Sequence, residues 1–120
     1  MPQVEGPLDP AQRDAAGHLV WQALRDLAGP MVERLAPHGI IGVHPVVGFV
    51  HPFEIHLWLA TATDAERDAL PSPDPFLDEV RAVVAASRFP HEHATIVGTV
   101  AESQETVDRD YEGSWWYARR

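Results

Sequence analysis

The chain has 120 residues, of which 45% are hydrophobic and 22% charged, as is usual for one globular domain. Nine arginines face eighteen acidic residues, so the formal net charge is −9, and there is no lysine, asparagine or cysteine. This composition excludes a basic surface for nucleic acid, disulfide bonds, zinc sites built on thiolates and a cysteine nucleophile. No stretch approaches the roughly 18 apolar residues of a membrane span, and no signal peptide is recognisable, so we expect a soluble cytoplasmic protein.

The first predicted element is a long helix that begins at Pro10 and ends at residues 37–39. Asp9 is a suitable N-cap, and proline is favoured at the first helical position. Apolar residues recur at steps of three and four, which is the pattern of one buried helix face: Leu19, Val20, Ala23, Leu24, Leu27, Met31 and Leu35. Gly29-Pro30 predicts a kink, or a break into two abutting helices. We expect residues 1–9 to be irregular and one domain to cover residues 10–120.

Two strands joined as a hairpin are predicted next. Residues 40–50 are rich in β-branched side chains, but Pro45 and Gly48 interrupt them, so this segment is expected to be an irregular or edge strand. Residues 53–62 alternate in polarity. One face carries Phe53, Ile55, Leu57 and Leu59, and the other carries Glu54, His56, Trp58 and Ala60. The linker His51-Pro52 is short enough for a hairpin.

Two further helices are predicted in the middle of the chain. Residues 63–66 (TDAE) form a capping box, which predicts a short helix from Asp64 to about Leu70. A stiff proline-rich loop at residues 71–75 leads to a second long helix, for which Ser72 is the expected N-cap. Apolar residues at helical spacing run from Phe76 to Val84, and Phe89-Pro90 is expected to end the helix.

The last third of the chain predicts a strand at residues 94–103, an acidic loop at 105–113 and a short aromatic strand at 114–118. The resulting order is α-β-β-α-β-β, which predicts an α+β fold: a two-layer sandwich of about four mainly antiparallel strands with helices on one face. We expect no series of βαβ units, and therefore no parallel doubly wound sheet.

The acidic and aromatic C-terminal segment is the strongest candidate for a functional surface. Residues 102–112 hold five acids and one arginine, and Trp115, Trp116 and Tyr117 follow directly. Large amphipathic aromatic side chains beside charges are typical of protein-binding surfaces. The predicted partner-binding residues are Trp58, Glu105, Asp108, Asp110, Trp115, Trp116 and Tyr117. The alternative is that these aromatic rings pack on a helix and the acids only solvate a loop.

From these features we predict a small acidic protein-interaction domain, such as an inhibitor or an immunity protein against a bacterial toxin, that binds a basic partner protein. The negative charge would steer the chain toward a basic partner. A homodimer formed through the edge strand at residues 40–50 and the aromatic strand is a further possibility. No complete catalytic motif is found, so an enzyme is not the favoured prediction.

The seven histidines support a second hypothesis, a metal-binding protein or metalloenzyme. His91 and His93 have the spacing that places two imidazoles on one face of a strand, which suits zinc or iron. A third ligand could come from His56, His51 or Glu102, depending on the order of the strands. No complete metal motif such as HExxH is present. Residues 93–97 also match half of the motif of two-histidine phosphoesterases, but the second half is missing.

Overall fold

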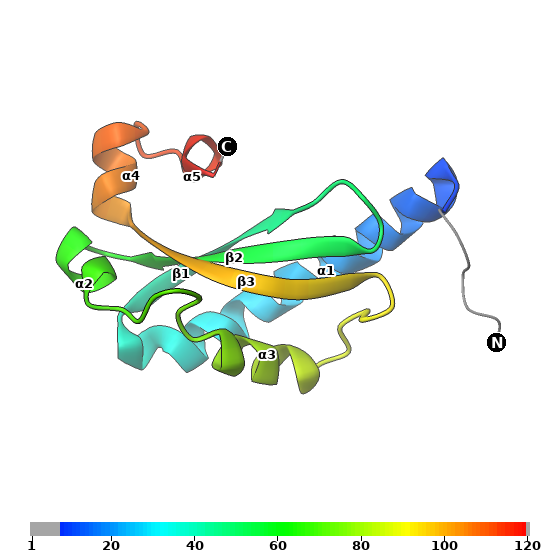
Figure 1. Cartoon of the computed structure of the whole chain (residues 1–120), viewed down its shortest axis with the longest axis horizontal. Helices are drawn as coiled ribbons and strands as arrows, with labels where there is room; N and C mark the ends of the chain where they lie inside the picture. The colour runs from blue at the N-terminus through cyan, green and yellow to red at the C-terminus, as the bar shows by residue number, and fades with distance from the viewer. Residues whose placement is uncertain (1–7, 120) are drawn as a thin grey trace.

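β2 (Phe53–Thr61), in which apolar and polar residues alternate, is the central strand of a three-stranded sheet. The structure, a computed structural model, describes residues 8–119 (Figure 1). β1 (Ile40–Val47) pairs with β2 in antiparallel orientation, as the predicted hairpin requires. β3 (Ala94–Ser103) lies on the other side of β2 and runs parallel to it. The fold is α+β with a mixed sheet.

One face of the sheet is covered by α1 (Pro10–Leu35) and α3 (Leu77–Ala85) (Figure 1). The predicted apolar face of β2 lies here, with Ile55, Leu57 and Leu59 at most 1% exposed. Asp9 caps α1 as expected: its carboxylate accepts the N–H of Gln12 at 2.8 Å, and the reciprocal bond completes a capping box. α1 continues through Pro30 as one helix and is followed by a 3₁₀ turn at Ala36–His38.

The connection from β2 to β3 crosses over the sheet and makes the two strands parallel. It consists of α2 (Asp64–Asp68), a proline-rich loop and α3, and the N-cap of α2 is Thr63, whose hydroxyl accepts the N–H of Glu66. This single crossover departs from the mainly antiparallel sheet that was expected, but the described residues form no series of βαβ units and no doubly wound sheet. Ser72 is not the cap of α3, because the helix begins after Phe76, which has a left-handed backbone (φ 57°).

The C-terminal elements are α4 (Gln104–Asp110) and α5 (Trp115–Ala118), on the side of the sheet opposite α1 and α3 (Figure 1). The acidic loop predicted at 105–113 is thus largely a helix, and the aromatic strand predicted at 114–118 is a helix as well. Each begins at a serine whose hydroxyl accepts a backbone N–H: Ser103 for Thr106 and Ser114 for Tyr117. A sheet of four mainly antiparallel strands with helices on one face is therefore not confirmed, because the described residues form three strands.

Of the helices in residues 8–119, none is long and apolar enough to cross a lipid bilayer. The irregular segment predicted at 1–9 lies outside the described residues except for Leu8 and Asp9.

Candidate functional site

α4 is held against α2 by a polar network around Asp64. The Asp64 carboxylate accepts hydrogen bonds from the hydroxyls of Ser103 and Thr106 and from the guanidinium of Arg109, the last at 3.0 Å. Arg67 extends the network, since its Nη1 donates to Glu102 at 2.7 Å and to Thr106 at 2.8 Å. We call these residues the Asp64 network: Asp64, Arg67, Glu102, Ser103, Thr106 and Arg109.

The electrostatics of the Asp64 network favour the charged forms of Asp64, Arg67 and Arg109. Hydrogen bonds from Ser103, then Thr106 and Arg109, hold the pKa of the Asp64 carboxyl well below its ordinary value. Hydrogen bonds to Asp64, and then to Asp110, raise the pKa of Arg109, and hydrogen bonds to Glu102 and Asp68 raise that of Arg67. Glu105 adds a contact, because its carboxylate accepts the backbone N–H of Asp64 at 3.2 Å. These acids are therefore used to join α2, β3 and α4.

α5 is attached to β1 by Trp115 and Arg119. The Trp115 indole stacks on the His44 imidazole, with ring centres 4.2 Å apart and planes 13° from parallel, and its Nε1 donates to Gln104 at 2.7 Å. Arg119 donates to the carbonyl of Pro45 at 2.6 Å. Burial, and then the charge of Arg119, lower the pKa of His44. Trp115 therefore serves to position α5.

Exposed aromatic rings and carboxylates gather on the outer side of α4 and α5. Tyr111, Trp116 and Tyr117 are 38%, 56% and 53% exposed, and the rings of Trp116 and Tyr117 meet edge to face at 5.2 Å. A cleft of about 500 Å³ is lined by Asp110, Tyr111, Glu112 and Tyr117. With Asp108 on the same helix, these residues form what we call the C-terminal surface: Asp108, Asp110, Tyr111, Glu112, Trp116 and Tyr117.

The cleft depends on the turn between the two helices. Glu112 and Gly113 both have left-handed backbones, with φ 55° and 78°. Gly113 suits this conformation because it has no Cβ, and a Cβ there would lie 3.3 Å from a carboxylate oxygen of Asp108. The turn reverses the chain, so Tyr111 at the end of α4 and Tyr117 in α5 line the same cleft.

The predicted partner-binding residues fall into two groups. Asp108, Asp110, Trp116 and Tyr117 belong to the C-terminal surface, although Asp108 also accepts a bond from Gln104 at 2.8 Å and Asp110 pairs with Arg109 at 3.3 Å. Glu105, Trp115 and Trp58 do not line the cleft: Glu105 contacts α2, Trp115 holds α5, and Trp58 is half-buried on β2 opposite His44.

Sequence reasoning missed Tyr111 and Glu112, although both lie in the acidic run before the tryptophans. Their role depends on the left-handed turn, for which Gly113 was the available signal.

The three proposed metal ligands do not converge. His93 lies 2.8 Å from His51, measured between Nδ1 and Nε2, whereas His91 packs edge-on against Phe89. His56 lies on β2 beside Gly98 of β3. Within the part of the chain that the structure describes, no group of three or more histidine or acidic side chains is arranged to hold a metal ion.

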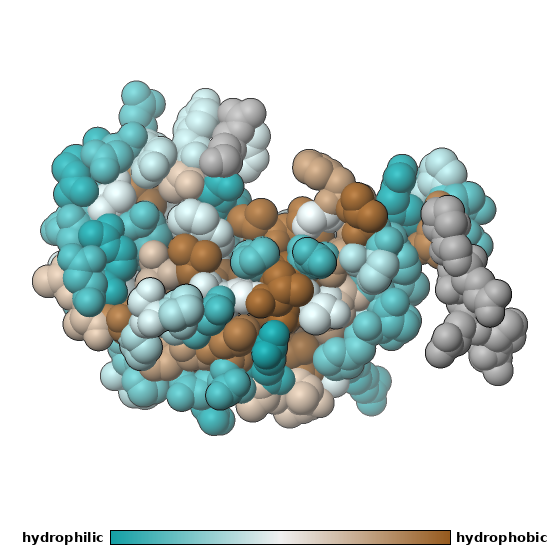
Figure 2. Space-filling view, viewed as in Figure 1, coloured by the Kyte–Doolittle hydropathy of each residue, from teal (hydrophilic) through white to brown (hydrophobic). Residues whose placement is uncertain are grey.

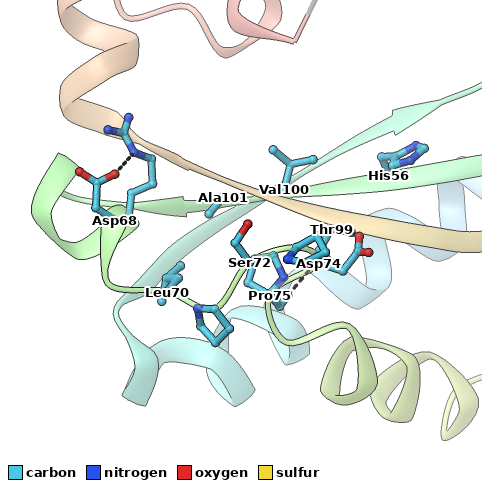
Figure 3. A pocket seen from close by; sticks show the side chains of 12 residues that line it. His56, Asp68, Leu70, Ser72, Asp74, Pro75, Thr99, Val100 and Ala101 are labelled. Atoms are coloured by element: carbon cyan, nitrogen blue, oxygen red, sulfur yellow. Dashed lines mark hydrogen bonds and ion pairs between the residues drawn. The ribbon is translucent and has the colours of Figure 1, made fainter.

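His56 lines a cavity of about 610 Å³ between β3 and the loop before α3 (Figure 3). Figure 3 shows Asp74 reaching from this loop toward β3, where its carboxylate accepts the N–H of Thr99 at 3.1 Å. Gly98 permits the approach, since a Cβ there would lie 2.7 Å from Asp74 Oδ1. The Thr99 hydroxyl donates to the Pro75 carbonyl at 2.6 Å. The loop therefore packs against the edge strand β3 at Gly98 and Thr99 and satisfies a backbone N–H there.

Comparison with known proteins adds no further assignment: no family model, no curated protein and no solved structure matches this chain.

Proposed function

We propose that this chain is a small protein-interaction domain, of the inhibitor or immunity type, whose C-terminal surface binds a basic partner protein. The observation that carries the proposal is the cleft in which Tyr111 and Tyr117 are combined with the carboxylates of Asp110 and Glu112. An arginine side chain fits this chemistry, because its guanidinium hydrogen-bonds to carboxylates and its flat face stacks on aromatic rings.

The surroundings of the cleft also suit a protein partner. Exposed tyrosine and tryptophan side chains supply much of the binding energy at protein interfaces. Trp116 and Tyr117 place two such rings beside the cleft, at the end of the chain where acids are concentrated. The net charge of −9 attracts a basic protein over distances longer than a contact and raises its rate of association.

The test is a titration of the folded protein with a short arginine-containing peptide, followed by NMR of the tyrosine and tryptophan rings. We expect saturable shifts at Tyr111, Tyr117 and Trp116, and weaker shifts when citrulline, which is uncharged, replaces arginine. The variant Asp110→Asn/Glu112→Gln should bind the arginine peptide about tenfold more weakly, since it keeps the shape of the cleft and loses both charges.

The matched control is Asp26→Asn/Glu33→Gln, which removes two charges from the exposed side of α1. It should bind the peptide as the wild type does, apart from a small loss that added salt abolishes. Equal weakening in both variants would show that only the net charge matters, and the absence of saturable shifts would contradict the proposal.

Metal binding is a second candidate function, now centred on His51 and His93 instead of the His91/His93 pair. The observation that favours it is the hydrogen bond of 2.8 Å between His51 Nε2 and His93 Nδ1, because a zinc ion bound to both nitrogens would take the place of the shared proton. We expect untagged protein to bind Zn²⁺ in a calorimetric titration and His51→Gln to lose this binding, whereas His91→Gln retains it. Absence of zinc binding in the wild-type protein would eliminate this candidate.

A further inference from the structure

The tip of the β1–β2 hairpin carries two large apolar side chains in water. Phe49 is 95% exposed and Val50 is 79% exposed. Hydrophobic atoms protrude in Figure 2 at the position that the hairpin tip occupies in Figure 1. Hairpin turns are normally built from small or polar residues. Apolar side chains at such a tip, close to Trp21 on α1, which is 41% exposed, are typical of a contact surface.

A groove lies directly beside this tip, between α1 and the hairpin. Its volume is about 380 Å³, and its walls include Val20, Trp21, Val47 and Phe53. Gly17 widens it, because a Cβ at that position would find no atom within 4 Å. Phe49 forms part of the rim and points into solvent. The surface therefore presents a projecting phenyl ring and a mainly apolar groove next to each other.

We propose that this surface binds a second copy of the chain, with Phe49 of each copy inserted in the groove of the other. In a dimer with two-fold symmetry, the projecting ring of each copy faces the groove of the other copy. A surface that carries both a projection and a groove is therefore complementary to itself. The charges agree with this arrangement. Arg13 and Asp14 both line the groove, so Arg13 of one copy can pair with Asp14 of the other.

Other occupants suit the groove less well. A basic partner is not favoured in the groove, because Arg13 there offsets the charge of Asp14. The cleft of the C-terminal surface, in contrast, is lined by two carboxylates and no arginine. An anionic lipid surface would repel a chain with a net charge of −9.

The dimer does not depend on the proposed function, and it leaves the C-terminal surface accessible. The hairpin tip lies at one end of the sheet, whereas α5 lies above the strands, next to His44 and Pro45 of β1 (Figure 1). A dimer would therefore carry two C-terminal surfaces and could bind two sites of one basic partner at once, which raises the apparent affinity.

The test is sedimentation equilibrium of the full chain from about 5 µM to about 1 mM, a range that covers the weak affinities expected of a small interface. We expect a reversible dimer for the wild type and a monomer for Phe49→Ser, with unchanged thermal unfolding of the monomer because Phe49 is exposed. Ile41→Ser is the control: Ile41 is also exposed, on β1 outside this groove, and its loss should leave the dimer intact.

The charge pair provides a second, independent test. Arg13→Glu or Asp14→Arg alone should weaken the dimer several-fold, and the two changes in the same chain should restore it, because the pairing is merely reversed. A wild type that is monomeric at all concentrations would overturn the proposal. The occupant of the groove would then have to be sought elsewhere, in residues 1–7 of this chain or in another protein. A Phe49→Ser variant that still dimerises would overturn it as well.

Discussion

Two acidic regions lie close together around α4, and they use their carboxylates differently. In the Asp64 network, the Asp64 carboxylate accepts bonds from two hydroxyls and a guanidinium, and Glu102 pairs with Arg67. On the C-terminal surface, Asp110 and Glu112 line a cleft open to solvent together with Tyr111 and Tyr117. The first region holds helices together, and the second is available to bind.

The comparison shows that acid content alone does not identify a binding surface. What separates the two regions is the supply of donors within the chain. Asp64 has donors in Ser103, Thr106 and Arg109, so its charge is satisfied. On the C-terminal surface Arg109 pairs with Asp110, whereas Glu112 lines the open cleft, which is why we propose that a cation of another molecule binds there.

The largest expected effect is the loss of the buried serine that starts α4. Ser103 is fully buried, caps α4 and donates to Asp64, so Ser103→Ala should lower the free energy of unfolding by about 2 kcal/mol. Ser114→Ala removes the equivalent cap of α5, next to the C-terminal surface. It should lower the free energy of unfolding by less than about 1 kcal/mol, because Ser114 is partly exposed. Urea unfolding measures both. Equal costs would contradict the distinction between the two regions.

Trp115 holds α5 against β1 and α4, and its loss should affect binding although it does not line the cleft. Trp115→Ala removes the stack on His44 and the bond to Gln104, so α5 should detach and Tyr117 should leave the cleft. We expect binding of the arginine peptide to weaken about three- to tenfold. Trp115→Phe, which keeps an aromatic ring on His44, should recover part of this loss. If Trp115→Ala bound the peptide as tightly as the wild type, α5 would not be positioned by this contact.

The Asp64 network should make stability depend on pH in the acidic range. Because the pKa of Asp64 is lowered in the folded chain from its ordinary 3.8, the unfolded chain takes up this proton first as the pH falls. The free energy of unfolding should therefore decrease as the pH drops below about 3.8, and above that value the full contribution is present. Asp64→Asn should show a shallower decrease in urea unfolding. Asp68→Asn, whose carboxylate is mostly exposed, should follow the wild type.

The smallest expected effect concerns His44 beneath α5. Its pKa is lowered in the folded chain from its ordinary 6.5, so the unfolded chain binds this proton more readily. The free energy of unfolding should therefore decrease slightly as the pH falls from about 7.5 to about 5.5. His44→Gln should reduce that decrease, and His91→Gln, at an exposed position outside the groove and the C-terminal surface, serves as the control for the loss of one histidine. A decrease that His44→Gln leaves unchanged would show that this histidine is not involved.

Much of the fold follows from local patterns. The alternation from Phe53 to Leu59 predicted the strand and its buried face, because successive side chains of a strand point to opposite sides. Asp9 and Thr63 predicted the starts of α1 and α2, because a capping side chain bonds to backbone only three residues away. The C-terminal helices were missed although Ser103 and Ser114 carry the same signal, since the acidic run resembled a loop and the three aromatics a strand.

The candidate site could be anticipated only in composition. The acidic run and the aromatic residues were visible, but the sequence did not separate Trp115, which contacts His44, from Trp116 and Tyr117, which lie on the surface. Similarly, the histidine spacing suggested a pair at 91 and 93, whereas the fold pairs His93 with His51.

By itself, then, the sequence determined the capped helices α1 and α2, the β1–β2 hairpin, the apolar face that forms the core and the acidic character of the chain. The tertiary structure decided that β3 runs parallel to β2, that residues 114–118 are helical, and that some acids are satisfied while others face solvent. The physical reason is the reach of the interactions: caps and alternation act over a few residues, whereas Asp64 meets Thr106, and His44 meets Trp115, only after the chain has folded.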